Sequence, residues 1–104
     1  MAITQIEPSK KFIRNENIIA RRIHGAFFLI DITDNYSGDK CSIYEINETG
    51  MFLWQAISSE RTAHDLAMLL LAEIVDDVDY AIVHEDVLSF LVTLCAHGFL
   101  LEVN

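Results

Sequence analysis

The sequence predicts an α+β domain in which a three-stranded antiparallel sheet is followed by three helices. Two observations lead to this fold class. At 104 residues, with 52% hydrophobic residues, one Pro and four Gly, the chain has the size and composition of one folded domain. Near Asn47 the spacing of its apolar residues changes from the alternation of a strand to the period of a helix. Strands are therefore expected before Asn47 and helices after it.

The first two strands are predicted as a hairpin. Residues 18–23 and 26–32 are rich in β-branched and aromatic side chains, and only His24 and Gly25 separate them. A two-residue connection that contains glycine is typical of a tight hairpin turn. The two segments are therefore expected to pair in antiparallel fashion.

A third short strand is predicted over residues 41–46. It follows residues 33–40, where Asp, Asn, Ser and Gly cluster as they do in turns. Alternation along the strand places Ser42, Tyr44 and Ile46 on one face and Cys41, Ile43 and Glu45 on the other. Neither face is wholly polar.

The first two helices have predicted caps. Asn47 is expected to cap a helix with one apolar stripe, formed by Gly50, Leu53, Trp54 and Ile57. Thr62 and Asp65 have the spacing of a capping box and are expected to open the second helix. Its inward positions are predicted to be Leu66, Leu69, Leu70 and Ile74.

A third helix is predicted over residues 84–97, ended by Gly98 and followed by a short strand over residues 99–103. Its apolar residues cover more of the circumference than one buried contact needs. One arc contains Val87, Phe90, Leu91 and Leu94, and a second arc contains Leu88, Val92 and Cys95. The second arc either packs on more of the same protein or awaits a partner.

Composition also limits the classes of partner. Seven basic against sixteen acidic residues give a formal charge of −9, which repels the phosphate backbone of nucleic acid. The first residues lack a signal-peptide core, and the longest apolar run, residues 66–72, is too short to span a bilayer. We therefore expect a cytoplasmic protein that binds neither nucleic acid nor a membrane. Cys41 and Cys95 lie far apart and are expected to be free thiols.

The residue types that carry catalysis or bind metals do not form recognisable motifs. The histidines are scattered along the chain, at positions His24, His64, His84 and His97. The acidic segment 76–79 lacks the glycine and the closing glutamate of a calcium loop, and no glycine-rich phosphate loop is present. We therefore expect no enzyme activity, no cofactor and no metal.

Several short motifs, in order and spacing, resemble the PqqD-like family of peptide-recognition domains. They are Ile46 and Asn47, Thr49, Gly50 and Trp54, Arg61 and Thr62, and then Asp86, Val87, Phe90, Leu91, Leu94 and Gly98. The resemblance implies a winged-helix-turn-helix-like domain over residues 18–104, preceded by an N-terminal extension over residues 1–17. It also implies a recognition element for ribosomally synthesised, post-translationally modified peptides (RiPPs).

In that family the leader part of a precursor peptide adds as an antiparallel strand to the third strand, in a cleft beside the third helix. The contacts implied here are Cys41, Ser42, Ile43, Tyr44, Glu45 and Ile46, with the second arc of Leu88, Val92 and Cys95 as the cleft wall. The implied partners are the precursor peptide and a modifying enzyme such as a radical SAM enzyme, a leader peptidase or a cyclase. The domain would act as a peptide chaperone in natural-product biosynthesis.

The resemblance leaves the pathway open. Ser58, Ser59 and Glu60 stand where the member that serves pyrroloquinoline quinone synthesis has an Asp-Gly turn, and Gly98 and Phe99 stand where it has Gly-Trp. A lasso-peptide or sactipeptide pathway fits as well. Two alternative functions are a winged-helix DNA-binding regulator, and an interaction domain that forms homodimers through its strand edge.

Overall fold

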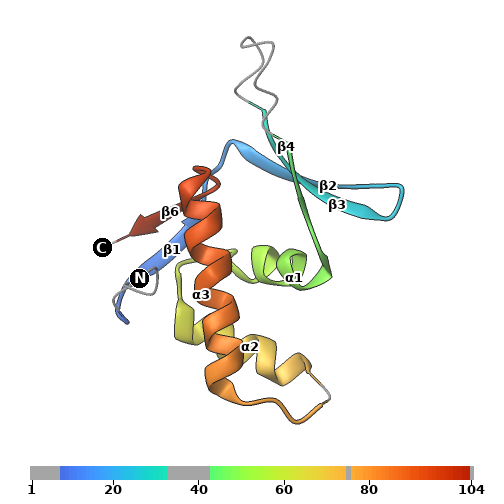
Figure 1. Ribbon diagram of the computed structural model, residues 1–104. Coiled ribbons are helices and arrows are strands. Elements are labelled where there is room, and N and C mark those ends of the chain that lie inside the picture. Colours follow the sequence, from blue (N-terminus) through green and yellow to red (C-terminus); the bar gives the residue numbers. More distant parts are fainter. Residues whose placement is uncertain (1–7, 33–42, 75, 104) are drawn as a thin grey trace.

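Figure 1 shows the computed structural model of the chain, in which residues 8–32, 43–74 and 76–103 are described. The elements follow one another in the order β1 Lys11–Arg14, β2 Ile18–Ile23, β3 Ala26–Asp31, β4 Ile43–Ile46, α1 Glu48–Ala56, β5 Arg61–Thr62, α2 Ala63–Glu73, α3 Tyr80–Ala96 and β6 Leu100–Val103. The predicted α+β class, with its three helices, is confirmed.

The described strands form two antiparallel sheets. β2, β3 and β4 pair in that order, as predicted, and β5, β1 and β6 form a second sheet that the sequence pattern did not predict as a unit. Figure 1 shows β1 and β6 beside the C-terminal half of α3, while β2, β3 and β4 extend from the other side of that helix. The helices share one core with strands of both sheets.

The β2–β3 hairpin follows from its two turn residues. His24 has a φ of 52° and Gly25 a φ of 83°, so both lie in the left-handed region. Positive φ at both central residues is the requirement of a type I′ turn, whose twist matches that of the strands. The register then pairs Ile23 with Ala26 and Ile18 with Asp31. The predicted hairpin is confirmed.

Strand β1 lies within the segment that we expected to be an N-terminal extension. Lys11–Arg14 pairs with both β5 and β6, and its Phe12 side chain is fully buried. Phe12 pairs with Glu102 and Arg61, which are distant in the sequence. A strand of only four residues with a basic residue at each end is hard to recognise from its own sequence. What stabilises it is pairing with strands that come much later in the chain. Residues 11–14 are part of the folded core.

The predicted caps of α1 and α2 are both present. The Gly50 backbone N–H donates to Asn47 Oδ1 at 2.8 Å. At α2, the Thr62 N–H donates to Asp65 Oδ2 at 3.0 Å and the Asp65 N–H donates to Thr62 Oγ1 at 3.1 Å. The backbone hydrogen bond from Thr62 is the main reason that the pKa of Asp65 lies below its usual value.

The inward face of α2 differs from the prediction. Leu66 is fully buried, but Leu69 is 37% exposed, and Leu70 and Ile74 are half-buried. The other buried residues of the helix are two alanines, Ala63 and Ala67. The buried strip of α2 is therefore narrow, and the wider leucine face turns partly toward solvent.

Helix α3 begins at Tyr80, four residues before the predicted start at residue 84. Its N-cap Asp79 makes no side-chain capping hydrogen bond, so no capping motif marked the start. Its end agrees with the prediction. Gly98 has a φ of 78°, the Gly98 N–H donates to the Cys95 carbonyl and the Phe99 N–H donates to that of Leu94. This pair of bonds is the Schellman motif.

One apolar core joins all these elements. Fully buried side chains come from β1, β3 and each of the three helices, represented by Phe12, Leu29, Trp54, Leu66 and Leu91. No helix among the described residues combines the length and apolar character needed to cross a membrane.

Candidate functional site

Strand β4 forms an edge of its sheet. In the described sheet it pairs with β3 alone, matching Ile46 to Phe27 and Tyr44 to Leu29. Tyr44 is half-buried and Ile46 buried, whereas Ile43 and Glu45 are exposed, which confirms the predicted alternation for these four residues. On the side away from β3, the strand offers backbone N–H and C=O groups to any extended chain that lies alongside.

A cleft separates this edge from α3, with a volume of about 240 Å³. We call it the β4–α3 cleft. One wall is the end of β4 with the start of α1, and the other is a face of α3. Its lining consists of Tyr44, Glu45, Ile46, Asn47, Gly50, Ser89, Phe90, Thr93 and Leu94.

Gly50 forms the floor of the cleft where β4, α1 and α3 come together. A Cβ atom at this position would lie 3.2 Å from Ile46 Cβ, 3.3 Å from Asn47 Oδ1 and 3.5 Å from Phe90 Cε1. The first two separations are tighter than ordinary contacts between carbon and its neighbours. The absence of a side chain at Gly50 therefore lets the strand and the two helices approach while the cleft stays open.

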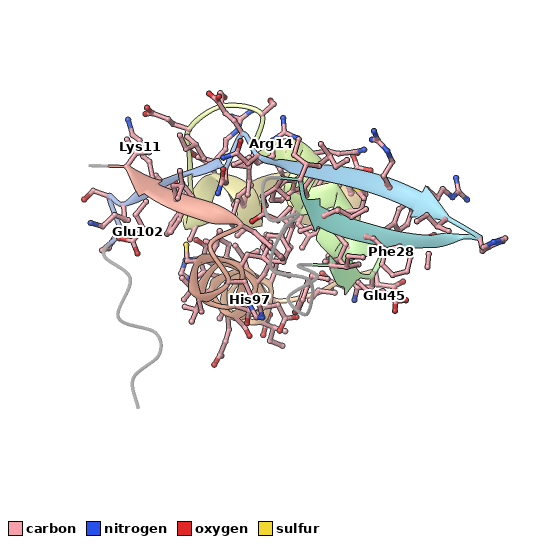
Figure 2. All side chains as sticks on the ribbon, turned by 90° about the horizontal axis from the view of Figure 1, so that it is seen from above. Lys11, Arg14, Phe28, Glu45, His97 and Glu102 are labelled. Carbon is pink, nitrogen blue, oxygen red and sulfur yellow. The ribbon has the colours of Figure 1, made fainter. Side chains whose placement is uncertain are left out.

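An aromatic cluster forms around Tyr44, at the other end of the cleft lining. The Tyr44 ring lies 5.0 Å from the His97 ring and 5.8 Å from the Phe99 ring, centroid to centroid, and His97 stacks on Phe99 at 5.7 Å. The His97 Nδ1 atom lies 2.8 Å from the Thr93 carbonyl oxygen, to which it donates. These contacts tie β4 to the C-terminal end of α3. Figure 2 shows Glu45 and His97 on the same side of the molecule, away from Arg14.

The strand residues predicted as a site are partly brought together by the fold. Tyr44, Glu45 and Ile46 line the β4–α3 cleft, and Ile43 lies on the same strand with 51% of its side chain exposed. Cys41 and Ser42 lie outside the described residues.

The helix residues predicted as the cleft wall do not line this cleft. Leu88 is only 9% exposed and belongs to the core, and Val92 is half-buried; neither lines the cleft. Cys95 is half-buried and is not part of the lining; burial, with Glu102 as a second cause, raises the pKa of its thiol to about 11. The wall is formed instead by Ser89, Phe90, Thr93 and Leu94.

The difference between the predicted wall and the lining of the cleft has a physical cause. A helical wheel gives the angles between side chains but does not say which neighbouring element lies at each angle. Phe90 and Leu94 were assigned to the core arc, yet they lie at its border, half-buried and buried respectively, and also face the cleft. In the sequence, Ser89 and Thr93 each directly precede an apolar residue, Phe90 and Leu94. This pattern was the available signal of a wall that is partly polar and partly apolar.

A larger hollow of about 650 Å³ lies between β2 and α1. Strand β2 is the other edge of its sheet, but it carries two adjacent exposed cations, Arg21 and Arg22. Charged side chains on an edge strand oppose pairing with a further strand. At the rim, the Arg14 guanidinium lies 5.5 Å from the centre of the Trp54 ring. Although this hollow is larger than the β4–α3 cleft, the charges on β2 make it a less favourable place for a further strand to pair.

Among the described residues, no group of three or more His, Cys, Asp or Glu side chains is placed to hold a metal ion. Away from the cleft, two histidines contact one tyrosine: His64 Nδ1 lies 2.7 Å from the Tyr80 hydroxyl oxygen, and the His84 ring stacks on the Tyr80 ring. The chemistry that the β4–α3 cleft offers is backbone hydrogen bonding beside a wall of two apolar and two hydroxyl side chains.

Comparison with known proteins gives one match to a family model and none to a curated protein. The family model for coenzyme PQQ synthesis protein D (PqqD) matches residues 36–100. No curated protein sequence matches the chain.

Three solved structures share the fold. The PqqD truncation of Methylobacterium extorquens PqqCD, described as a functional and stand-alone RiPP recognition element, has 16% identity and a TM-score of 0.71, covering 97% of this chain and 99% of that one. TbiB1 in complex with the TbiA(beta) leader peptide has 16% identity and a TM-score of 0.66, with coverage of 85% and 93%. Lasso peptide synthetase B1, complexed with the leader peptide, has 19% identity and a TM-score of 0.66, with coverage of 86% and 96%.

Proposed function

The chain belongs to the coenzyme PQQ synthesis protein D (PqqD) family, and from this premise we propose that it binds the leader region of a ribosomally synthesised precursor peptide and presents it to a modifying enzyme. The observation that carries the proposal is the edge of β4 facing α3, with Phe90 and Leu94 in its wall, across an open cleft. Two of the structures that share the fold are complexes with leader peptides, which supports the same reading.

The mechanism is β-strand addition. An extended leader segment would pair with the backbone of β4, antiparallel to it, while alternate side chains point into the β4–α3 cleft. Backbone pairing supplies affinity that depends little on sequence, and the apolar contacts with Phe90 and Leu94 supply selectivity. Residues 41–46 of the chain remain the proposed strand contacts, with the helix wall revised to the residues that line the cleft.

The role is recognition and not catalysis. The domain would raise the local concentration of the precursor near its enzyme, which we propose to be a radical SAM enzyme, a leader peptidase or a cyclase. Because the precursor is made on ribosomes, we propose the cytoplasm as the compartment. The formal charge of −9 and the exposed Glu45 beside the cleft favour a leader with basic residues.

The competing functions differ in what they require of α3 and β4. A groove-reading helix is rich in Arg and Lys, and Tyr80–Ala96 contains neither. Homodimer formation would use the same β4 edge, so a dimer that dissociates when peptide is added would fit both functions. Light scattering with and without peptide distinguishes a peptide-binding monomer from a permanent dimer.

The direct test is a backbone amide NMR titration with the leader of the precursor peptide encoded beside this chain's gene. We expect the largest shift changes in Ile43–Ile46 and in Ser89, Phe90 and Thr93. A scrambled peptide of the same composition is the control and should cause much smaller changes. Shift changes confined to β2, or none at all, would contradict the proposal.

A further inference from the structure

A second groove, which we call the helical groove, continues from the β4–α3 cleft. It has a volume of about 440 Å³ and lies between α1, the end of α2 and the first half of α3. Asn47, Gly50, Ser89 and Phe90 line both the groove and the cleft. The two hollows therefore meet at these residues and form one track along α3.

The chain direction sets which part of a bound peptide reaches this groove. β4 begins near the end of α3, where Tyr44 contacts His97 and Phe99, and it ends near the middle of α3, where Ile46 and Phe90 both approach Gly50. The strand thus runs against the direction of α3. A peptide antiparallel to β4 runs with α3, so its N-terminal flank leaves the strand at Ile46 and Asn47, at the mouth of the helical groove.

The lining of the groove indicates the chemistry of its occupant. Leu53 is buried, Leu70, Ile74 and Val78 are partly buried, and Ile82 has 56% of its side chain exposed at the rim. An exposed isoleucine next to a hollow of leucine, isoleucine and valine offers apolar surface that is still in contact with water. The charged side chain in the lining is the exposed carboxylate of Asp86, one turn after Ile82.

We propose that the helical groove is a second specificity site, which binds an apolar side chain located N-terminal to the strand-forming part of the leader, with a basic residue next to it facing Asp86. The proposal rests on the proposed function, because it takes the direction of the peptide from pairing with β4. It assigns to α1, α2 and the first half of α3 a role in selecting the precursor, in addition to their role in the core.

The test uses two synthetic peptides from the precursor encoded beside this chain's gene. The short peptide contains only the residues that pair with β4 in the NMR titration, and the long peptide adds the four residues that precede them. Calorimetry should give an affinity for the long peptide about tenfold or more above that for the short one, the order expected for burying one apolar side chain.

Two matched pairs of variants locate the gain. Ile82→Glu should remove most of the extra affinity for the long peptide and leave the short one unchanged, whereas Met68→Glu, on the exposed face of α2 outside the groove, should change neither. Asp86→Asn should reduce the salt dependence of binding the long peptide, and Glu85→Gln, one residue earlier and outside the lining, should not. Circular dichroism checks that each variant is folded.

The outcomes separate the two proposals. If the short peptide binds but the four added residues bring no gain, or if Ile82→Glu weakens both peptides equally, the helical groove is not a specificity site and the proposed function stands. If neither peptide binds the wild-type chain, both proposals are wrong. A gain that Met68→Glu removes as fully as Ile82→Glu would also overturn the assignment to the groove.

Discussion

The ring of Tyr44 on β4 lies 5.0 Å from the ring of His97, the residue that ends α3. This contact connects the edge strand to the helix that forms the opposite wall of the cleft, and Phe99 contacts both rings, edge-on to Tyr44 and stacked on His97. It holds one end of the cleft at a set width, while Gly50 sets the other end. The proposed binding edge is therefore positioned by contacts outside its own sheet.

Removing the Tyr44 ring should release β4. We expect Tyr44→Ala to lower the free energy of unfolding by about 2 kcal/mol, because a half-buried ring and two aromatic contacts are lost. Urea unfolding measures the change. Tyr44→Phe keeps the ring contacts and is the control; an equal loss in both variants would show that the hydroxyl, and not the ring, is the important group.

A side chain at Gly50 should narrow the cleft. Gly50→Val places atoms against Ile46, Asn47 and Phe90, and we expect a loss of about 1–3 kcal/mol in stability together with weaker peptide binding. Gln55→Val introduces the same residue at an exposed position of the same helix and should have a small effect on both. Unchanged affinity in a folded Gly50→Val protein would contradict the role of this glycine in the cleft.

The lining of the cleft leads to a direct comparison of two exposed α3 positions. Ser89→Trp fills the junction of the cleft and the helical groove, and we expect it to abolish leader binding in a folded protein. Glu85→Trp, one turn earlier and outside both linings, should bind as the wild type does. Fluorescence anisotropy with a labelled leader peptide measures both, and equal affinities would place the peptide elsewhere.

The capping box of α2 should make stability depend on pH at the acidic end. The folded-state pKa of Asp65 is lowered, so its contribution is present above the ordinary aspartate value of 3.8 and is lost as pH falls through the lowered pKa. We expect Asp65→Asn to cost about 1 kcal/mol at neutral pH and progressively less below about pH 4. Urea unfolding as a function of pH tests this.

Asp77→Asn provides the control for that pH series, because Asp77 is exposed in the segment between α2 and α3 and takes no part in the cap. Its stability difference from the wild type should be small at every pH. If the Asp65→Asn difference stayed constant down to pH 2, the carboxylate would not be the group that stabilises the helix start.

Much of this fold is determined by local signals in the sequence. The hairpin turn at His24 and Gly25, the Asn47 cap, the capping box of Thr62 and the Gly98 stop are all present as predicted. Each depends on the backbone preferences and hydrogen bonds of residues within a few positions of one another. Such features can be recognised without knowledge of the rest of the chain.

Only the tertiary structure decided which surfaces face one another. Strand β1 exists because β5 and β6 pair with it from distant parts of the chain, and α2 buries Leu66 and two alanines while Leu69 turns outward. The sequence separates the two apolar arcs of α3 by their angle around the helix, but it does not say which strand or helix packs against each arc. The wall of the cleft is formed by Ser89, Phe90, Thr93 and Leu94 because β4 lies opposite that face of α3, and long-range packing alone sets this position.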